Sequence, residues 1–319
     1  PQVSIDFNTT AVELVGNDQG QVLSVSAVGA DGKTTLYTAA KGVIMATGGY
    51  SGNKELMGEY AEYGSEYLAG GSTAADGYGI RMMQLVGAKV DAETMGYIPT
   101  FPMGYDRGDG TGSIAPSYTW KAGGICVNQE GKRFVDETED AVEIREEQTN
   151  AIQYDIFTDK IIADLQANKA STFWDFFYSE GKPYSNAVVT AASLEELAEK
   201  LGMPAENLKA TVEDYNSHVK SGETDEFGRQ FTQDSLNTYN LAINEISGDK
   251  FYAIPLKALC VMTLGGVTTN TDTQVLDESG KVIPGLYAVG EWAASGAGSS
   301  PAAPASWAPS PSAALPDAP

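Results

Sequence analysis

The chain has 319 residues, of which 42% are hydrophobic and 9% aromatic, a composition typical of a globular protein. Its 43 Asp and Glu residues outnumber its 20 Lys and Arg residues and give a formal net charge of −23. This charge argues against binding to nucleic acid or anionic lipid, because both depend on cationic side chains, and no apolar run is long enough to cross a membrane.

The first fifty residues predict β structure. Turn signals at 16–20 and 30–33 separate three strand candidates, which are residues 10–15, 21–28 and 34–38. The all-apolar run 42–46 follows, and such a run is typical of a strand buried on both faces in a parallel α/β sheet. Asp76 precedes apolar residues at helical spacing over 77–86, so it is predicted to be the N-cap of a helix.

The rest of the chain predicts helices mixed with short strands. Residues 125–127 and 133–135 flank a turn signal and predict a β-hairpin. Ser193 and Glu196 form a capping box ahead of one helix, and Pro204 opens a second helix. The remaining candidates for short buried strands are residues 274–276 and 285–289. Residues 293–319 are almost wholly Ala, Ser, Gly and Pro, which predicts a disordered or non-native tail.

Two strand candidates end in turns that contain glycine. The residues at the first end are Ala46, Thr47, Gly48 and Gly49, and those at the second end are Gly290 and Glu291. In an open α/β sheet, ligands bind beyond the carboxyl ends of strands, glycine lets the backbone approach a cofactor, and an acidic residue accepts hydrogen bonds from sugar hydroxyls. The pattern indicates a dinucleotide groove but is also typical of two ordinary turns, and the chain contains no G-x-G-x-x-G phosphate loop.

Other kinds of catalytic site find little support. His218 is the only histidine, and the only two cysteines, Cys126 and Cys260, lie in apolar runs, so no metal site is expected. The sequence lacks the G-x-S-x-G turn of a nucleophilic serine. The acidic run 136–147 is typical of a solvated face, and Arg145 within it is typical of a surface ion pair.

Several segments resemble a known family in their order and spacing. They are residues 41–57, 74–93, 123–137, 225–229 and 263–291. Together these segments resemble the fumarate reductase/succinate dehydrogenase-type flavoproteins, in particular the soluble fumarate-reductase-like and urocanate-reductase-like branch. The resemblance implies a partial α/β Rossmann-like FAD-binding domain with an inserted α+β capping domain. It places the FAD-binding domain at 1–93 and 264–292, the capping domain at 94–263 and the tail at 293–319.

The strand ends and the resemblance together give a set of cofactor-binding candidates for FAD. The set is Ala11, Ala46, Thr47, Gly48, Gly49, Asp76, Gly265, Gly266, Gly290 and Glu291. The family's strand–GxGxxG–helix segment, which binds the FAD pyrophosphate, would lie before Pro1, and its C-terminal flavin-site helix would replace the tail. The sequence therefore resembles a fragment, which alone is expected to bind FAD poorly or not at all.

The positions that match the family's fumarate-binding residues carry other side chains. They are Ile98, which replaces the histidine of the family's His-Pro-Thr ahead of the matching Pro99 and Thr100, then Pro116, Ser117, Trp120 and Ala141, and finally Val261 and Met262. Apolar side chains would leave a substrate carboxylate unpaired, which costs several kcal/mol. We therefore expect that fumarate is not the substrate and that a less charged enone or enoate takes its place.

The resemblance implies hydride transfer between flavin N5 and an activated C=C or C–C bond of a small-molecule substrate. Our candidates for the catalytic donors are Tyr97, Tyr118 and Arg145. Relatives imply an electron donor that carries FMN or haem, on a fused domain or a separate protein. Two alternatives stay open: a truncated and inert FAD-domain fragment, and a 3-ketosteroid-dehydrogenase-like desaturase.

Overall fold

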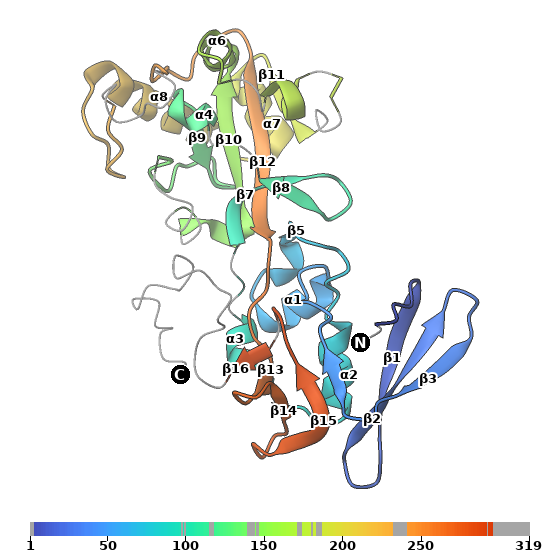
Figure 1. The fold of residues 1–319 in the computed structure, drawn as a ribbon. Coiled ribbons are helices and arrows are strands. Elements are labelled where there is room, and N and C mark those ends of the chain that lie inside the picture. The colour runs from blue at the N-terminus through green and yellow to red at the C-terminus, as the bar shows by residue number, and fades with distance from the viewer. Residues whose placement is uncertain are drawn as a thin grey trace. The chain divides into compact units, whose positions relative to one another are not determined.

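The computed structural model describes residues 3–96, 98, 100–114, 118–138, 144, 147–170, 174–179, 181–182, 187–231, 241–291 and 293–295. The chain folds into two compact units (Figure 1). Unit 1 comprises Pro1–Ser65, Gly71–Pro99 and Met262–Pro319, and unit 2 comprises Glu66–Gly70 and Thr100–Val261. Their assignment to an FAD-binding domain and a capping domain stays a prediction. Within the described ranges, no helix is both long and apolar enough to cross a bilayer.

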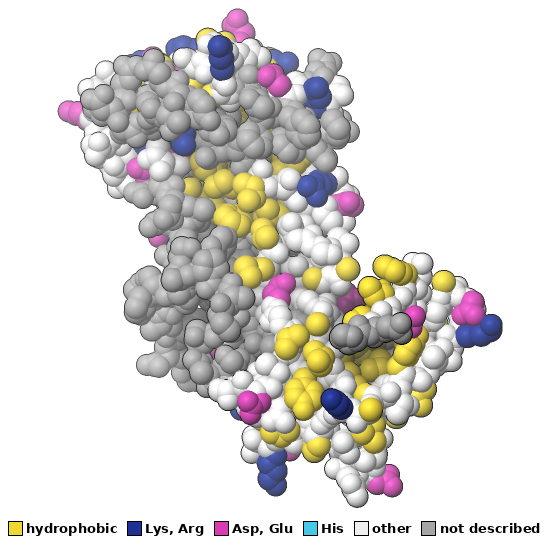
Figure 2. All heavy atoms as spheres, in the orientation of Figure 1, with side chains coloured by type: hydrophobic (Ala, Val, Ile, Leu, Met, Phe, Trp, Pro, Cys, Tyr) yellow, Lys and Arg dark blue, Asp and Glu magenta, His cyan; other side chains and the backbone are white. Residues whose placement is uncertain are grey.

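The first sheet of unit 1 is a meander of the three strands predicted near the N-terminus. They are β1 (Thr9–Gly16), β2 (Val22–Gly29) and β3 (Thr34–Thr38), and each pairs antiparallel with the next. β3 is exposed along its whole length. Hydrophobic side chains gather on this part of the surface in Figure 2. The exposed large hydrophobic residues here are Val3, Ile5, Phe7, Leu36 and Tyr37.

The second sheet of unit 1 has six strands of mixed direction, in the order β16-β13-β14-β15-β4, with β6 also paired to β13. Their bounds are β4 (Val43–Met45), β6 (Val90–Asp91), β13 (Gly266–Thr269), β14 (Gln274–Leu276), β15 (Val282–Ala288) and β16 (Ala293–Ser295). β15 and β4 run parallel, with Ala288 opposite Met45. Ile44 is 68% exposed, so the prediction that this strand is buried on both faces is wrong. The described residues leave the face of β4 to which Ile44 points uncovered.

The helices of unit 1 are short. They are α1 (Lys54–Tyr60), α2 (Tyr78–Leu85) and α3 (Ala92–Gly96), and the 3₁₀ turn η1 (Gly64–Glu66) spans the boundary to unit 2. Asn53 caps α1 by accepting a hydrogen bond from the Leu56 backbone N at 2.9 Å. The N-cap of α2 is Gly77 rather than the predicted Asp76. Gly77 turns the chain with a left-handed φ of 71°, and Asp76 accepts a hydrogen bond from the Tyr78 backbone N at 2.9 Å in the turn before the helix.

Unit 2 is built around a seven-stranded sheet in the order β8-β7-β12-β10-β9, with β5 and β11 also paired to β12. The bounds are β5 (Leu68–Ala69), β7 (Thr100–Asp106), β8 (Gly112–Ile114), β9 (Ile125–Val127), β10 (Ile152–Thr158), β11 (Val189–Ala191) and β12 (Phe251–Cys260). The turn of the predicted hairpin is confirmed, since Asn128 N donates to Lys132 O at 2.9 Å. Its second strand is not, because Arg133 forms only an isolated bridge with Val127.

Helices flank this sheet. They are α4 (Tyr118–Lys121), η2 (Thr149–Ala151), α6 (Asp159–Ala167), the π-helical turn η3 (Trp174–Tyr178), α7 (Leu194–Leu201) and α8 (Ala205–Ser221). The capping box of α7 is confirmed, since the Ser193 hydroxyl accepts a hydrogen bond from Glu196 N at 3.2 Å. The Glu196 carboxylate reaches back to Ala192 N at 2.8 Å. α8 buries Leu208, Val212 and Tyr215.

Four charged side chains form a buried network in the core of unit 2. They are Arg133, Glu137, Asp225 and Arg229. The Arg133 guanidinium donates to both Glu137 oxygens at 2.8 Å each and to Asp225 at 2.7 Å, and Arg229 donates to Glu137 at 2.7 Å. The prediction that the acidic run is solvated is therefore wrong for Glu137, which is 2% exposed. Burial raises the pKa of Glu137, but the two guanidinium groups outweigh it and hold this pKa below its ordinary value.

The network predicts a large effect of removing its central charge. Glu137→Gln should lower the free energy of unfolding by about 3–5 kcal/mol, because the buried Arg229 then loses its carboxylate partner and the buried Arg133 keeps only Asp225. Urea denaturation followed by circular dichroism measures this change. Lys209→Met is the control, since it breaks the exposed Lys209–Glu195 ion pair and should have a far smaller effect. Equal losses in the two variants would contradict the prediction.

Candidate cofactor site

The two glycine-containing strand ends lie side by side in unit 1. β4 and β15 are parallel neighbours, and Val289 N extends their ladder with a hydrogen bond to Met45 O at 3.1 Å. The chain therefore leaves both strands at the same edge of the sheet, where parallel strands present their carboxyl ends. The structure brings together Gly48 and Gly49 after β4 with Gly290 and Glu291 after β15.

Glu291 and Thr263 tie these turns to the segment that precedes β13. The Oε1 atom of Glu291 accepts hydrogen bonds from Thr263 N at 2.7 Å and from the Thr263 hydroxyl at 3.0 Å. The same hydroxyl oxygen accepts a hydrogen bond from Tyr50 N at 3.1 Å. A Cβ on Gly49 would collide with both Thr263 Oγ1 and Glu291 Oε1, so this position requires glycine for space.

Gly48 has a different surrounding from Gly49. Its φ is 79°, and no atom of the described chain lies within 4 Å of where its Cβ would be. The backbone at Gly48 is therefore open to a neighbouring molecule. Thr47 points elsewhere, since its side chain packs on the first turn of α2 at Gly79. Ala46 is exposed beside it.

A second glycine pair lies at the start of β13. Gly265 and Gly266 are buried and have φ angles of 76° and 126°, which favour glycine. A Cβ on Gly265 would lie 2.7 Å from Met95 N in α3. The buried Tyr50 hydroxyl donates to Met95 O at 2.7 Å and lies 3.2 Å from Leu264 O, so it joins the turn after β4 to α3 and to this pair.

The remaining cofactor candidates lie at two other places. Asp76 is exposed, but the next residue, Gly77, donates from its backbone N to Gly49 O at 3.1 Å, so this turn borders the strand ends. Ala11 lies in β1, opposite Ala27, and belongs to the meander rather than to the sheet that carries the strand ends. Sequence reasoning missed Thr263 and Tyr50, although both lie within or next to the segments that carry the resemblance.

The described structure does not test the three catalytic candidates. Tyr97 and Arg145 lie outside the described residues, and so do Pro99, Pro116, Ser117 and Ala141. Tyr118 is the first residue of α4 in unit 2, and its side chain lies outside the described part. Trp120 is 1% exposed and belongs to the core of unit 2.

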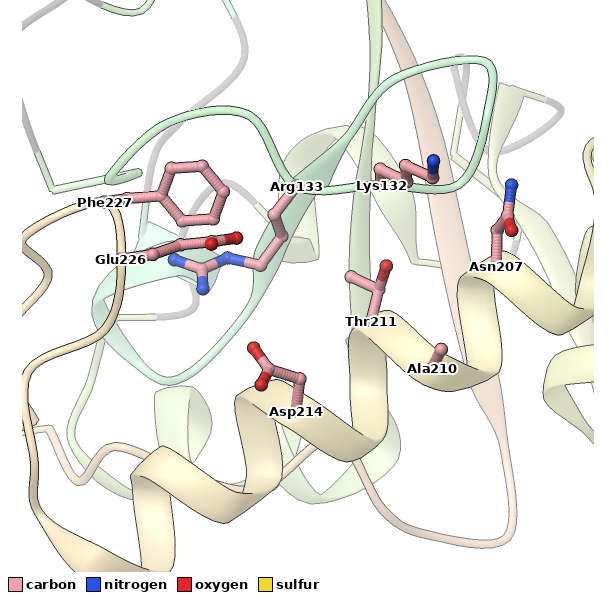
Figure 3. A pocket seen from close by; sticks show the side chains of 8 residues that line it. All are labelled: Lys132, Arg133, Asn207, Ala210, Thr211, Asp214, Glu226 and Phe227. Carbon is pink, nitrogen blue, oxygen red and sulfur yellow. The ribbon is translucent and has the colours of Figure 1, made fainter.

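A separate surface pocket of about 280 Å³ lies in unit 2 (Figure 3). Side chains from the turn before Arg133, from α8 and from the loop at Glu226 and Phe227 surround it. The Arg133 guanidinium there forms an ion pair with Glu137 of the buried network and lies 5.0 Å from the centre of the Phe227 ring. None of the predicted cofactor or catalytic residues lines this pocket.

The strand-end residues fit part of a dinucleotide cofactor. Gly48 leaves space for close approach to the backbone, and the glycine pair 265–266 gives a backbone surface with little side-chain bulk. The Glu291 carboxylate can accept hydrogen bonds from sugar hydroxyls, in addition to those from Thr263. The phosphate loop typical of such sites is absent from the sequence.

Comparison with known proteins agrees with this fit. Residues 1–304 match the family described as FAD binding domain. The NADH:acrylate oxidoreductase of Vibrio harveyi is 31% identical over 292 residues, which cover 89% of this chain and 27% of that protein. The urocanate reductase of Eggerthella lenta is 32% identical over 292 residues, which cover 90% of this chain and 45% of that protein.

A solved structure shows the same fold. The open conformation of a flavocytochrome c3 fumarate reductase aligns with a TM-score of 0.64 and 25% sequence identity, over 89% of this chain and 46% of that one. The chain thus spans less than half the length of each of these three relatives. The family match extends over nearly the whole chain, and FAD is the cofactor that it implies. The chain belongs to the FAD binding domain family of the fumarate and urocanate reductases.

Proposed function

We propose that this chain is part of an FAD-dependent oxidoreductase that transfers a hydride to or from an activated carbon–carbon bond of a small organic molecule. The observation that carries the proposal is the convergence of the turns at Gly48 and Glu291, which Thr263 holds together. Bound FAD would supply the hydride acceptor or donor. The chain's own contribution is to hold the cofactor, to orient the substrate and to provide a proton.

Different residues would hold different parts of the cofactor. The Glu291 carboxylate would accept hydrogen bonds from hydroxyl groups, because carboxylate oxygens are strong acceptors and Thr263 fixes the position of this one. Gly48 and the pair 265–266 would lie against flat or extended parts of the cofactor, where a Cβ would keep the ligand away. Ala11 would contribute a backbone group at the adenine, as the resemblance implies.

The edge of β4 supports the proposal that the complete protein adds structure to unit 1. Among the described strands, β4 pairs only with β15, and its central residue Ile44 is exposed. Apolar parallel strands are normally covered on both faces. We infer that a further strand and a covering helix belong here in the complete protein. FAD binding by the chain without these additional elements would support the proposed function, and a lack of binding would favour the alternative of an inert fragment.

The substrate that we propose is an enone or enoate with little charge. Acrylate and urocanate, which name two relatives, are α,β-unsaturated monocarboxylates. The positions that match the family's dicarboxylate-binding residues include Ile98, Val261 and Met262, and none of these can pair with a carboxylate. A protein donor carrying FMN or haem would supply electrons for reduction.

Reduction of such a bond also needs a proton donor on the protein. Tyr97, Tyr118 and Arg145 remain our candidates, since a phenol or a guanidinium can donate a hydrogen bond to the substrate carbonyl or a proton to the adjacent carbon. The same residues could serve desaturation, where the proton moves in the opposite direction. The apolar side chains at the positions that match the family's dicarboxylate-binding residues favour an uncharged ketone as the substrate for desaturation.

The cofactor proposal predicts the effect of filling the space at Gly49. Titration of the purified chain with FAD, followed by flavin fluorescence, should show weak but saturable binding. Gly49→Ala should raise the dissociation constant at least about tenfold, roughly 1.4 kcal/mol, because the added methyl displaces Thr263 and Glu291.

The control for this measurement is Gly280→Ala. Gly280 has a φ of 79° in an exposed turn with no atom near its Cβ position, so this variant tests backbone strain without a collision. Its FAD affinity should match that of the unmodified chain. A folded chain that shows no saturable binding would favour the inert alternative.

The substrate proposal predicts a preference for uncharged acceptors. The FAD-loaded chain, reduced without oxygen, should be reoxidised at least about tenfold faster by 2-cyclohexenone than by fumarate, because a buried unpaired carboxylate costs more than 1.4 kcal/mol. Stopped-flow absorbance at the flavin band gives both rates, with free reduced FAD as the baseline. A faster reaction with fumarate would refute this preference, and dye reduction by cyclohexanone tests the desaturating direction.

A further inference from the structure

A buried acid in unit 2 has no part in the proposed cofactor site. Asp155 lies in β10 and is 3% exposed. Its Oδ2 atom accepts a hydrogen bond from the Thr119 hydroxyl at 2.6 Å, whereas its Oδ1 atom has no hydrogen-bond partner in the described structure. A carboxylate buried with so few partners is costly, so this environment favours the neutral acid.

The groups around Asp155 reinforce this preference. Cys126 lies opposite it in the β9–β10 ladder, and Glu137 and Tyr178 are the other titratable groups close enough to interact. No described Lys or Arg pairs with Asp155, since Arg133 and Arg229 bind Glu137. Burial raises the pKa of Asp155 from 3.8 to about 7, although the hydrogen bond from Thr119 and the nearby Trp120 indole N–H oppose the rise and Glu137 adds to it. The Trp120 indole N–H lies near enough to have this effect without forming a hydrogen bond of good geometry.

Asp155 is one of several described side chains that hold α4 and the turn after it. Thr119 of α4 donates to Asp155, and Arg229 donates to Trp120 O at 2.8 Å. Asn244 donates to Ala122 O at 3.0 Å where the helix ends. A four-residue helix has too few internal hydrogen bonds to be stable alone, so these anchors, together with the burial of Trp120, determine where it lies.

We propose that Asp155 is a protonation-controlled anchor for residues 118–124, and that it thereby positions Tyr118. The contact between Asp155 and α4 is observed in the structure. A catalytic role for it rests on the proposed function, in which Tyr118 is a candidate proton donor. Asp155 is a positioning residue in this proposal. The neutral acid keeps the segment closed, and ionisation favours an opened state in which water reaches the carboxylate.

The direction of the pH effect follows from linkage. The closed state holds its proton up to a higher pH than the opened state does, so closure is most favoured below about pH 4 and weakens as the pH rises towards 7. Above pH 7 both states are ionised and the effect levels off. Between pH 5 and pH 8 the opening equilibrium should increase on the order of a hundredfold if opening exposes the carboxyl group fully.

Hydrogen–deuterium exchange of the full chain tests the proposal. Peptides that cover 118–127 should lose protection from pH 5 to pH 8, after correction for intrinsic exchange rates. Asp155→Asn keeps an acceptor for Thr119 without the charge and should remove most of this pH dependence. Asp272→Asn is the matched control, because it removes an equal charge from an exposed turn in unit 1 and should behave like the unmodified chain.

Two further measurements keep the proposal falsifiable if Asp155→Asn does not fold. Thr119→Val should lower protection of this segment at both pH values, because the anchor is lost. The infrared carbonyl band of a protonated buried acid should disappear from the unmodified chain between pH 5 and pH 8. Unchanged protection across this range, or wild-type pH dependence in Asp155→Asn, overturns the proposal. These readouts need no flavin, so they are independent of whether the chain binds FAD.

Discussion

The hydrogen bonds between Glu291 and Thr263 are the constraint on which unit 1 depends. One carboxylate oxygen joins the turn after β15 to the segment before β13, and Thr263 passes the connection on to Tyr50 after β4. These residues are far apart in the sequence, since Thr263 follows Tyr50 by 213 positions. The crowding that results leaves room only for glycine at position 49. The conformation of these turns thus follows from contacts within the protein itself.

In unit 2, buried charged side chains stabilise the packing of the core. Two of the segments that carry the family resemblance, 123–137 and 225–229, meet in the network of Arg133, Glu137, Asp225 and Arg229. The guanidinium groups also lie over the Tyr215 ring, at 5.3 and 5.2 Å from its centre. Removing four charged groups from water costs free energy. Ion pairing offsets this desolvation cost only when the four side chains are arranged so that each charge meets its partners. In this chain the two motifs are therefore a packing device that defines the core of unit 2.

The features that were predictable from sequence depend on near neighbours. The meander of β1–β3 follows from turns and alternation, and α7 follows from a capping box three residues apart. Asp76 was misassigned because Gly77 changes the direction of the chain, which residue type alone does not reveal. Glu137 was misassigned because Arg229 lies 92 positions away, and Asp155 gave no signal because its burial comes from the whole sheet. The glycine-containing strand ends were recognised, whereas Thr263, which joins them, has no local signature.

Among the described strands, β4 pairs only with β15 and β3 is exposed along its whole length, and this has a consequence for the chain in solution. Both present backbone groups and apolar side chains that could pair with a second copy. A net charge of −23 opposes such contact between copies, and dissolved salt weakens this repulsion. Colloidal stability of the isolated chain should therefore be greatest at low ionic strength, where long-range repulsion keeps the exposed strands of different copies apart.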